Sequence, residues 1–113
     1  MRTVTLEVSS REETNRRLLR AFEGRPQGVF ISFDTPALLF KVLTQKRWEL
    51  LAALTGAGPM TLRAAARRVG RDVKAVHGDV HALLNAGILQ KTAQGRIVFP
   101  FDAVRVNFML KAA

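Results

Sequence analysis

The fold is decided by residues 61–96, which read TLRAAARRVGRDVKAVHGDVHALLNAGILQKTAQGR. Between Leu62 and Val69, apolar residues recur at intervals of three and four, a spacing typical of one face of a helix. Thr61 is a suitable N-cap for this helix, and Gly70 is a suitable residue for its carboxyl end. The pattern therefore predicts a short amphipathic helix that is followed at once by a turn.

A second helix is expected directly after this turn. Asp72 is expected to cap its amino end, and Gly87 is expected to end it. The apolar residues that form its buried stripe are Val73, Val76, Val80, Leu83 and Leu84. The other residues of the helix would therefore face outward.

Residues 88–92 and 96–101 are then expected to form a hairpin with its tip at Ala93-Gln94-Gly95. Two helices joined by a short connection such as Gly70-Arg71-Asp72 are typical of a helix-turn-helix, whose second helix enters the major groove of DNA. The hairpin behind the second helix would be the wing. The stretch thus predicts a winged helix-turn-helix.

Strands and helices are also expected before this stretch. Thr3–Val8 and Val29–Phe33 alternate in polarity as strands do, and the helix between them ends near Glu23. The order strand, helix, strand could bring the two strands together through a crossover. Thr35 is expected to cap a further helix that has Pro36 at its first position.

The helix Thr44–Thr55 is expected to be the first of a three-helix core, with Trp48 on its buried side. At the end of the chain, Val104–Leu110 alternates as a final strand, which needs a partner from the N-terminal strands of its own chain or of a second subunit. The predicted fold class is therefore α+β. We expect an N-terminal strand-helix-strand extension over residues 1–40, a winged helix-turn-helix over residues 41–101 and a C-terminal strand over residues 102–113.

Composition narrows the class of protein. A chain of 113 residues is expected to be one domain, and the absence of cysteine excludes disulfides and thiolate metal sites. No stretch approaches the roughly 20 apolar residues that a membrane helix needs. We therefore expect a cytoplasmic protein that makes no membrane contact.

The net charge of +9 is unevenly distributed. Residues 41–96 hold ten Lys or Arg against three Asp or Glu, which gives +7 for the segment that contains the expected helix-turn-helix. A basic surface of this kind is the electrostatic signature of nucleic-acid binding. Double-stranded DNA is therefore the expected partner.

The segment from Leu43 to Val106 resembles a group of small bacterial and archaeal winged helix-turn-helix DNA-binding regulators. The runs that carry the resemblance are Leu43-Thr44, Lys46-Arg47, Glu49-Leu50-Leu51, Gly70-Arg71-Asp72, Val76-His77, Asp79-Val80, Leu83, Ala86-Gly87-Ile88-Leu89, Gly95-Arg96 and Pro100-Phe101-Asp102. The hinge from Leu83 to Leu89 is also similar to that of MarR-like and ArsR-like repressors. Gly78 departs from the pattern, because such proteins can carry a basic or polar side chain there. The resemblance implies a repressor, and because some members are encoded beside TumE-type toxins it also implies an antitoxin role.

Catalytic chemistry is not expected. His77 and His81 are spaced as two metal ligands on a helix, but Gly78 stands where the helical metalloprotease pattern needs a glutamate, and no third ligand is spaced to join them. The chain also lacks a glycine-rich phosphate loop and a nucleophile elbow. We therefore expect no enzyme activity, no cofactor and no metal.

The residues expected to contact DNA come from the two helices, their connection and the hairpin. They are Arg63, Arg67, Arg71, Lys74, Ala75, His77, Gly78, His81, Lys91, Gln94 and Arg96. A homodimer is expected, because regulators of this size place two recognition helices in successive major grooves. A sequence-specific DNA-binding repressor is the leading hypothesis. The alternatives are an antitoxin that also binds a cognate toxin, and a winged-helix module that assembles with a partner without binding DNA.

Overall fold

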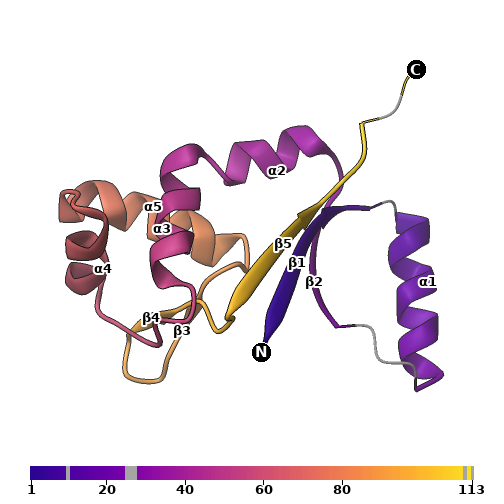
Figure 1. The fold of residues 1–113 in the computed structure, drawn as a ribbon, viewed down its shortest axis with the longest axis horizontal. Helices are drawn as coiled ribbons and strands as arrows, with labels where there is room; N and C mark the ends of the chain where they lie inside the picture. The colour runs from indigo at the N-terminus through magenta and orange to yellow at the C-terminus, as the bar shows by residue number, and fades with distance from the viewer. Residues whose placement is uncertain (10, 25–27, 111, 113) are drawn as a thin grey trace.

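The structure is a computed structural model that describes residues 1–9, 11–24, 28–110 and 112. It is an α+β fold in which the strands of a small sheet lie between α1 on one side and α3, α4 and α5 on the other (Figure 1). In chain order the elements are β1 (Thr3–Val8), α1 (Arg11–Phe22), β2 (Val29–Phe33), α2 (Pro36–Val42), α3 (Gln45–Leu54), α4 (Leu62–Val69), α5 (Val73–Asn85), β3 (Gln90–Lys91), β4 (Ile97–Val98) and β5 (Ala103–Asn107).

The main sheet has the strand order β2-β1-β5, and β1 runs parallel to both of its neighbours. The expected crossover is confirmed, because β1 and β2 pair with Val4 opposite Val29. The last strand finds its partner within the same chain, with Val4 also opposite Val104. It is shorter than expected, however, because the pairing with β1 ends at Asn107 and leaves residues 108–110 outside the ladder. The two ends of the chain therefore share one sheet.

The sheet turns an apolar face toward the helices α2 and α3. Val4 and Leu6 of β1 are fully buried and belong to the same core as Leu50 and Leu54 of α3. Because neighbouring side chains of a strand point to opposite faces, Glu7 lies on the other side of the sheet. There the guanidinium of Arg17 from α1 forms an ion pair with Glu7 and lies 3.9 Å from the centroid of the Phe30 ring.

Helix α1 is held mainly by these polar contacts, because its large apolar side chains stay exposed. Leu18, Leu19 and Phe22 have exposed fractions of 55%, 62% and 87%. The apolar side chains of this helix are therefore not buried within the described part of the chain.

The boundaries of the central helices follow the expected capping residues. The side chains of Thr44, Thr61 and Asp72 accept hydrogen bonds from the backbone N–H groups of Arg47, Ala64 and Lys74, respectively. Gly70 ends α4 in the left-handed conformation with a φ of 65°, which favours glycine over a residue with a side chain.

Two expectations about burial in these helices are wrong. Trp48 is 42% exposed, because the neighbouring strand β5 leaves an open groove beside it. Val73 is 38% exposed, because it occupies the first position of α5, beside a depression in the surface. The buried stripe of α5 is formed instead by Val76, Val80 and Leu83.

The hairpin is present, but its strands are shorter than residues 88–92 and 96–101. Ile88 and Leu89 are buried, and their N–H groups bond to the carbonyl of Leu83 at the end of α5 and not to a neighbouring strand. Ile97 forms two backbone hydrogen bonds of 2.9 Å with Met60, which attaches the hairpin to the segment before α4. None of the helices in the described residues is long and apolar enough to cross a membrane.

Candidate nucleic-acid interface

The outer face of α5 is open to solvent and carries the residues expected there. Lys74, Ala75, His77, Gly78 and His81 are all exposed. Gly78 has ordinary helical geometry, and a Cβ atom added to it would meet no other atom within 4 Å. Packing within the chain therefore does not require glycine at position 78.

The two histidines on this face lie side by side, with ring centroids 4.1 Å apart and planes tilted by 51°. No group of three His, Cys, Asp or Glu side chains that could hold a metal ion is found in the part of the chain that the structure describes. The pair is therefore best described as two exposed polar rings on the face of α5.

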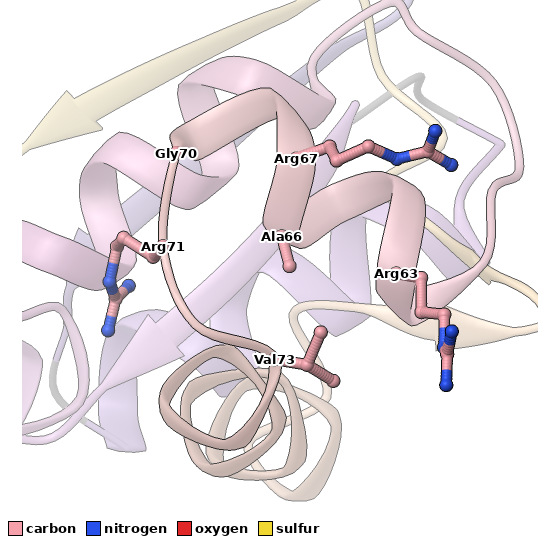
Figure 2. A pocket seen from close by; sticks show the side chains of 6 residues that line it. All are labelled: Arg63, Ala66, Arg67, Gly70, Arg71 and Val73. Carbon is pink, nitrogen blue, oxygen red and sulfur yellow. The ribbon is translucent and has the colours of Figure 1, made fainter.

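Beside the amino end of α5 lies an open, basic depression of about 600 Å³ (Figure 2). Its lining comes from α4, the connection and the start of α5: Arg63, Ala66, Arg67, Gly70, Arg71 and Val73. Arg63 and Arg67 lie one helical turn apart on α4, and both are exposed. Neither forms an ion pair with any residue described in the structure. They therefore present free positive charge.

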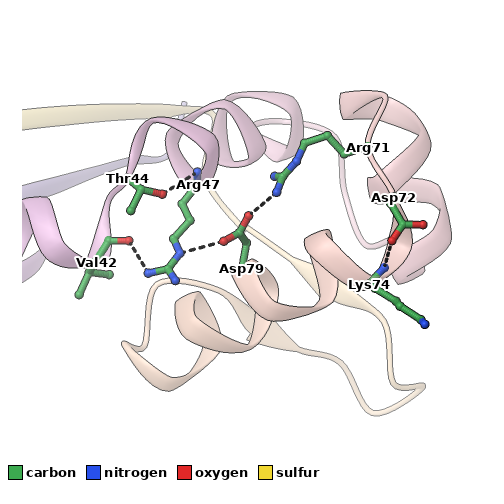
Figure 3. A network of polar contacts seen from close by, with 7 residues as sticks. All are labelled: Val42, Thr44, Arg47, Arg71, Asp72, Lys74 and Asp79. Atoms are coloured by element: carbon green, nitrogen blue, oxygen red, sulfur yellow. Dashed lines mark hydrogen bonds and ion pairs between the residues drawn. The ribbon is translucent and has the colours of Figure 1, made fainter.

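Arg71, in contrast, is turned inward and belongs to a network that joins three parts of the fold (Figure 3). Its Nη2 atom lies 2.8 Å from Oδ2 of Asp79 on α5. Arg47 of α3 lies on the other side of the same carboxylate, with its Nε atom 3.0 Å from Oδ1. Arg47 also donates a hydrogen bond of 3.1 Å from Nη1 to the carbonyl oxygen of Val42.

The network fixes the charge of Asp79. Burial of the carboxyl acts to raise the pKa of Asp79, but the hydrogen bonds and positive charges of Arg71 and Arg47 outweigh it, so the pKa lies below its ordinary value of 3.8. The side chains of all three residues are between 16% and 24% exposed. Asp79 is therefore ionised at neutral pH, and its negative charge is covered by two arginines.

The hairpin carries the remaining residues of the expected site. The N–H of Thr92 bonds to the carbonyl of Arg96, and the N–H of Gly95 bonds to the carbonyl of Thr92, which closes the tip tightly. Lys91, Gln94 and Arg96 are exposed. Within the described residues, no hydrogen bond or ion pair joins these side chains to the outer face of α5, so the hairpin and α5 present their cations separately.

The comparison with family models identifies a match to the HVO_A0114 model over residues 42–106, which is more than half of the chain. The chain belongs to the HVO_A0114 family. No curated protein and no solved structure matches the chain. The segment shared with the HVO_A0114 family runs from the last residue of α2 into β5, and it contains every residue of the expected site.

Within the HVO_A0114 segment, the network around Asp79 was not predicted from the sequence. Arg71 was expected to contact DNA, but the structure places its side chain against Asp79, where it fixes the connection between α4 and α5. A signal was present, because Asp79 is the only acidic residue within α5 and lies between the buried residues Val76 and Val80. An acid next to a buried stripe needs a cationic partner, and Arg47 and Arg71 provide it.

Proposed function

We propose that this protein binds double-stranded DNA as a sequence-specific transcriptional regulator of the winged helix-turn-helix class. In this proposal α3, α4 and α5 are the three-helix core, α5 lies in the major groove, and the hairpin β3–β4 is the wing. The architecture supports it, because α4 and α5 are joined by the short connection Gly70-Arg71-Asp72 and the hairpin directly follows α5.

One observation carries the proposal: the outer face of α5 presents no negative charge. Asp79 is the only carboxylate within the helix, and it points inward between Arg47 and Arg71. The outer face is left with Lys74, two histidines and residues with small side chains. A helix that enters the major groove passes between two phosphate backbones, so an acid on that face would oppose binding.

The proposal assigns different roles to different residues. Arg63, Arg67 and Arg96 are suited to phosphate contacts, which determine affinity and position. Lys74, His77 and His81 are suited to the edges of bases, which determine sequence preference. Ala75 and Gly78 have small side chains or none, so that the backbone of α5 can come close to the DNA at these two positions. Arg71 holds the connection in place and contacts no phosphate.

A regulator of this kind acts as a homodimer on a palindrome and represses by occupying its operator. A second candidate function is the binding of a protein partner such as a toxin, which would make the chain an antitoxin that also regulates its operon. The exposed residues Leu18, Leu19 and Phe22 of α1 favour this second function, because an apolar stripe of this kind is a common feature of protein-binding surfaces.

Charge removal from the depression tests the proposal. The double variant Arg63→Ala/Arg67→Ala should weaken binding to a random-sequence DNA duplex by at least about tenfold in a gel-shift titration at low salt, because two phosphate contacts are lost. Arg20→Ala is the matched control, since Arg20 is an exposed arginine on α1. Equal binding by the double variant and the parent protein would show that α4 does not face DNA.

A further inference from the structure

Within the part of the chain that the structure describes, the second edge of strand β5 has no partner strand. In the described sheet β5 is a terminal strand that pairs only with β1, so the backbone groups along its outer edge are available for pairing. An open edge of this kind binds a further strand unless charge, proline or a covering element prevents it. Strand β5 contains no proline, and its one charged residue, Arg105, lies on the sheet face opposite to Val104 and Val106.

The apolar face of the same edge is also uncovered. Val106 is 41% exposed, and Val104 borders a groove of about 280 Å³ whose other walls come from α3, including Trp48 and Ala52. Beyond the strand, the ring of Phe108 meets the ring of Phe40 from α2 edge-on, with centroids 5.6 Å apart. These exposed side chains, which we call the apolar band, come from β5, from the residue that follows it and from the helices α2 and α3.

The size of this band suits one half of a dimer interface. Phe40, Trp48, Val106 and Phe108 together leave roughly 350 Å² of side-chain surface exposed, given that a large aromatic side chain has about 150–250 Å² to bury. A standard interface buries about 800 Å² on each partner, of which about 65% is apolar in homodimers. The band therefore supplies roughly two thirds of the apolar share of one such surface, and the backbone edge and the other residues of β5 supply the rest.

We propose that β5 pairs antiparallel with β5 of a second copy of this chain, about a two-fold axis at Val106. This register places Val104 opposite Phe108 of the second copy and Arg105 opposite Asn107, so that the two arginines avoid each other. A register centred on Arg105 would place two like charges directly opposite, which is destabilising. The paired sheets form one continuous sheet of six strands with a shared apolar face.

The other open edge, β2, is a weaker choice. It lies outside residues 42–106, the segment that matches the family model, whereas β5 lies almost entirely within it. The exposed apolar side chains of α1 also lie outside that segment, and a helix surface offers no unpaired strand edge. The dimer rests on the proposed function in one respect, because it would set the distance between the two α5 helices that bind DNA. The dimer itself forms without DNA, so it can be measured without DNA.

Cysteine cross-linking tests the register, because the natural chain contains no cysteine. Val106→Cys should give mostly covalent dimer with a short bifunctional maleimide at micromolar protein concentration. Val29→Cys is the matched control, since Val29 is a valine of similar exposure (39%) on the other edge strand, and it should stay monomeric on denaturing gels. Cross-linking of Val29→Cys but not Val106→Cys, or of neither, would overturn the proposal.

A charged residue placed at the two-fold axis tests whether the β5 pairing stabilises the dimer. Val106→Asp places two carboxylates opposite each other, so the dissociation constant of the dimer, measured by sedimentation without DNA, should rise at least about a hundredfold. Circular dichroism checks that this variant is folded. Emission from Trp48, the single tryptophan, should shift to the red on dilution of the parent protein as the dimer separates. A monomeric parent protein at tens of micromolar, or a dimer unaffected by Val106→Asp, would contradict the pairing, whether or not the protein binds DNA.

Discussion

At the scale of single residues, substitution of Gly78 should change the stability of the fold and the affinity for DNA in opposite directions. Glycine inside a helix costs about 0.5–1 kcal/mol relative to alanine, and an added Cβ would meet open space. Gly78→Ala should therefore raise the free energy of unfolding by up to that amount. DNA affinity should fall in the order Gly78, Gly78→Ala, Gly78→Gln as the side chain grows, as measured by thermal melts and gel shifts on the same samples. Parent-like binding by both variants would show that α5 does not lie deep in a groove at this position.

Residues also show where sequence reasoning succeeds. Thr61, Gly70 and Asp72 were predicted correctly as capping residues, because a cap depends on neighbours only two to four positions away. The exposure of Trp48 and the inward position of Arg71 were not predicted. The first depends on where β5 lies, and the second on a carboxylate eight positions away on the inner side of another helix.

At the scale of elements, Asp79 joins α5 to α3 and to the connection after α4. Asp79→Asn leaves Arg47 and Arg71 facing a neutral amide in a largely buried site, so the free energy of unfolding should fall by about 2 kcal/mol in urea titrations at pH 7. Asp34→Asn is the control, because Asp34 is exposed. An equal effect of the two substitutions would show that the network does not stabilise the fold.

The contacts of Asp79 with Arg47 and Arg71 also predict how the free energy of unfolding depends on pH. The pKa of Asp79 is lowered in the folded protein, so the stability that it contributes is complete above its ordinary value of 3.8 and is lost as the pH falls through the lower folded-state pKa. The difference in stability between the parent protein and Asp79→Asn should therefore be constant from about pH 5 to pH 8 and should shrink below about pH 3.8. A difference that disappeared near pH 6 would point to a group other than Asp79.

At the scale of the whole molecule, the order and type of the elements were predictable, but their assembly was only partly so. The parallel pairing of β1 with β2 follows from a strand-helix-strand order. The pairing of β1 with β5 joins residues about a hundred positions apart, and the alternation of polarity in the last strand does not indicate whether its partner belongs to the same chain. The expected DNA-contact residues all lie within one segment of the fold, from α4 to the hairpin.

If the basic region of α4, α5 and the hairpin binds the phosphates of DNA, the affinity for DNA should fall steeply as the salt concentration rises. Four exposed cations that are available for phosphates, Arg63, Arg67, Lys91 and Arg96, form no ion pair with the described residues. If all four contact phosphates, the logarithm of the association constant for a random duplex should fall with the logarithm of salt concentration with a slope of about −3.6 per chain. A slope near zero, or no binding at low salt, would show that this region does not bind the phosphates of DNA.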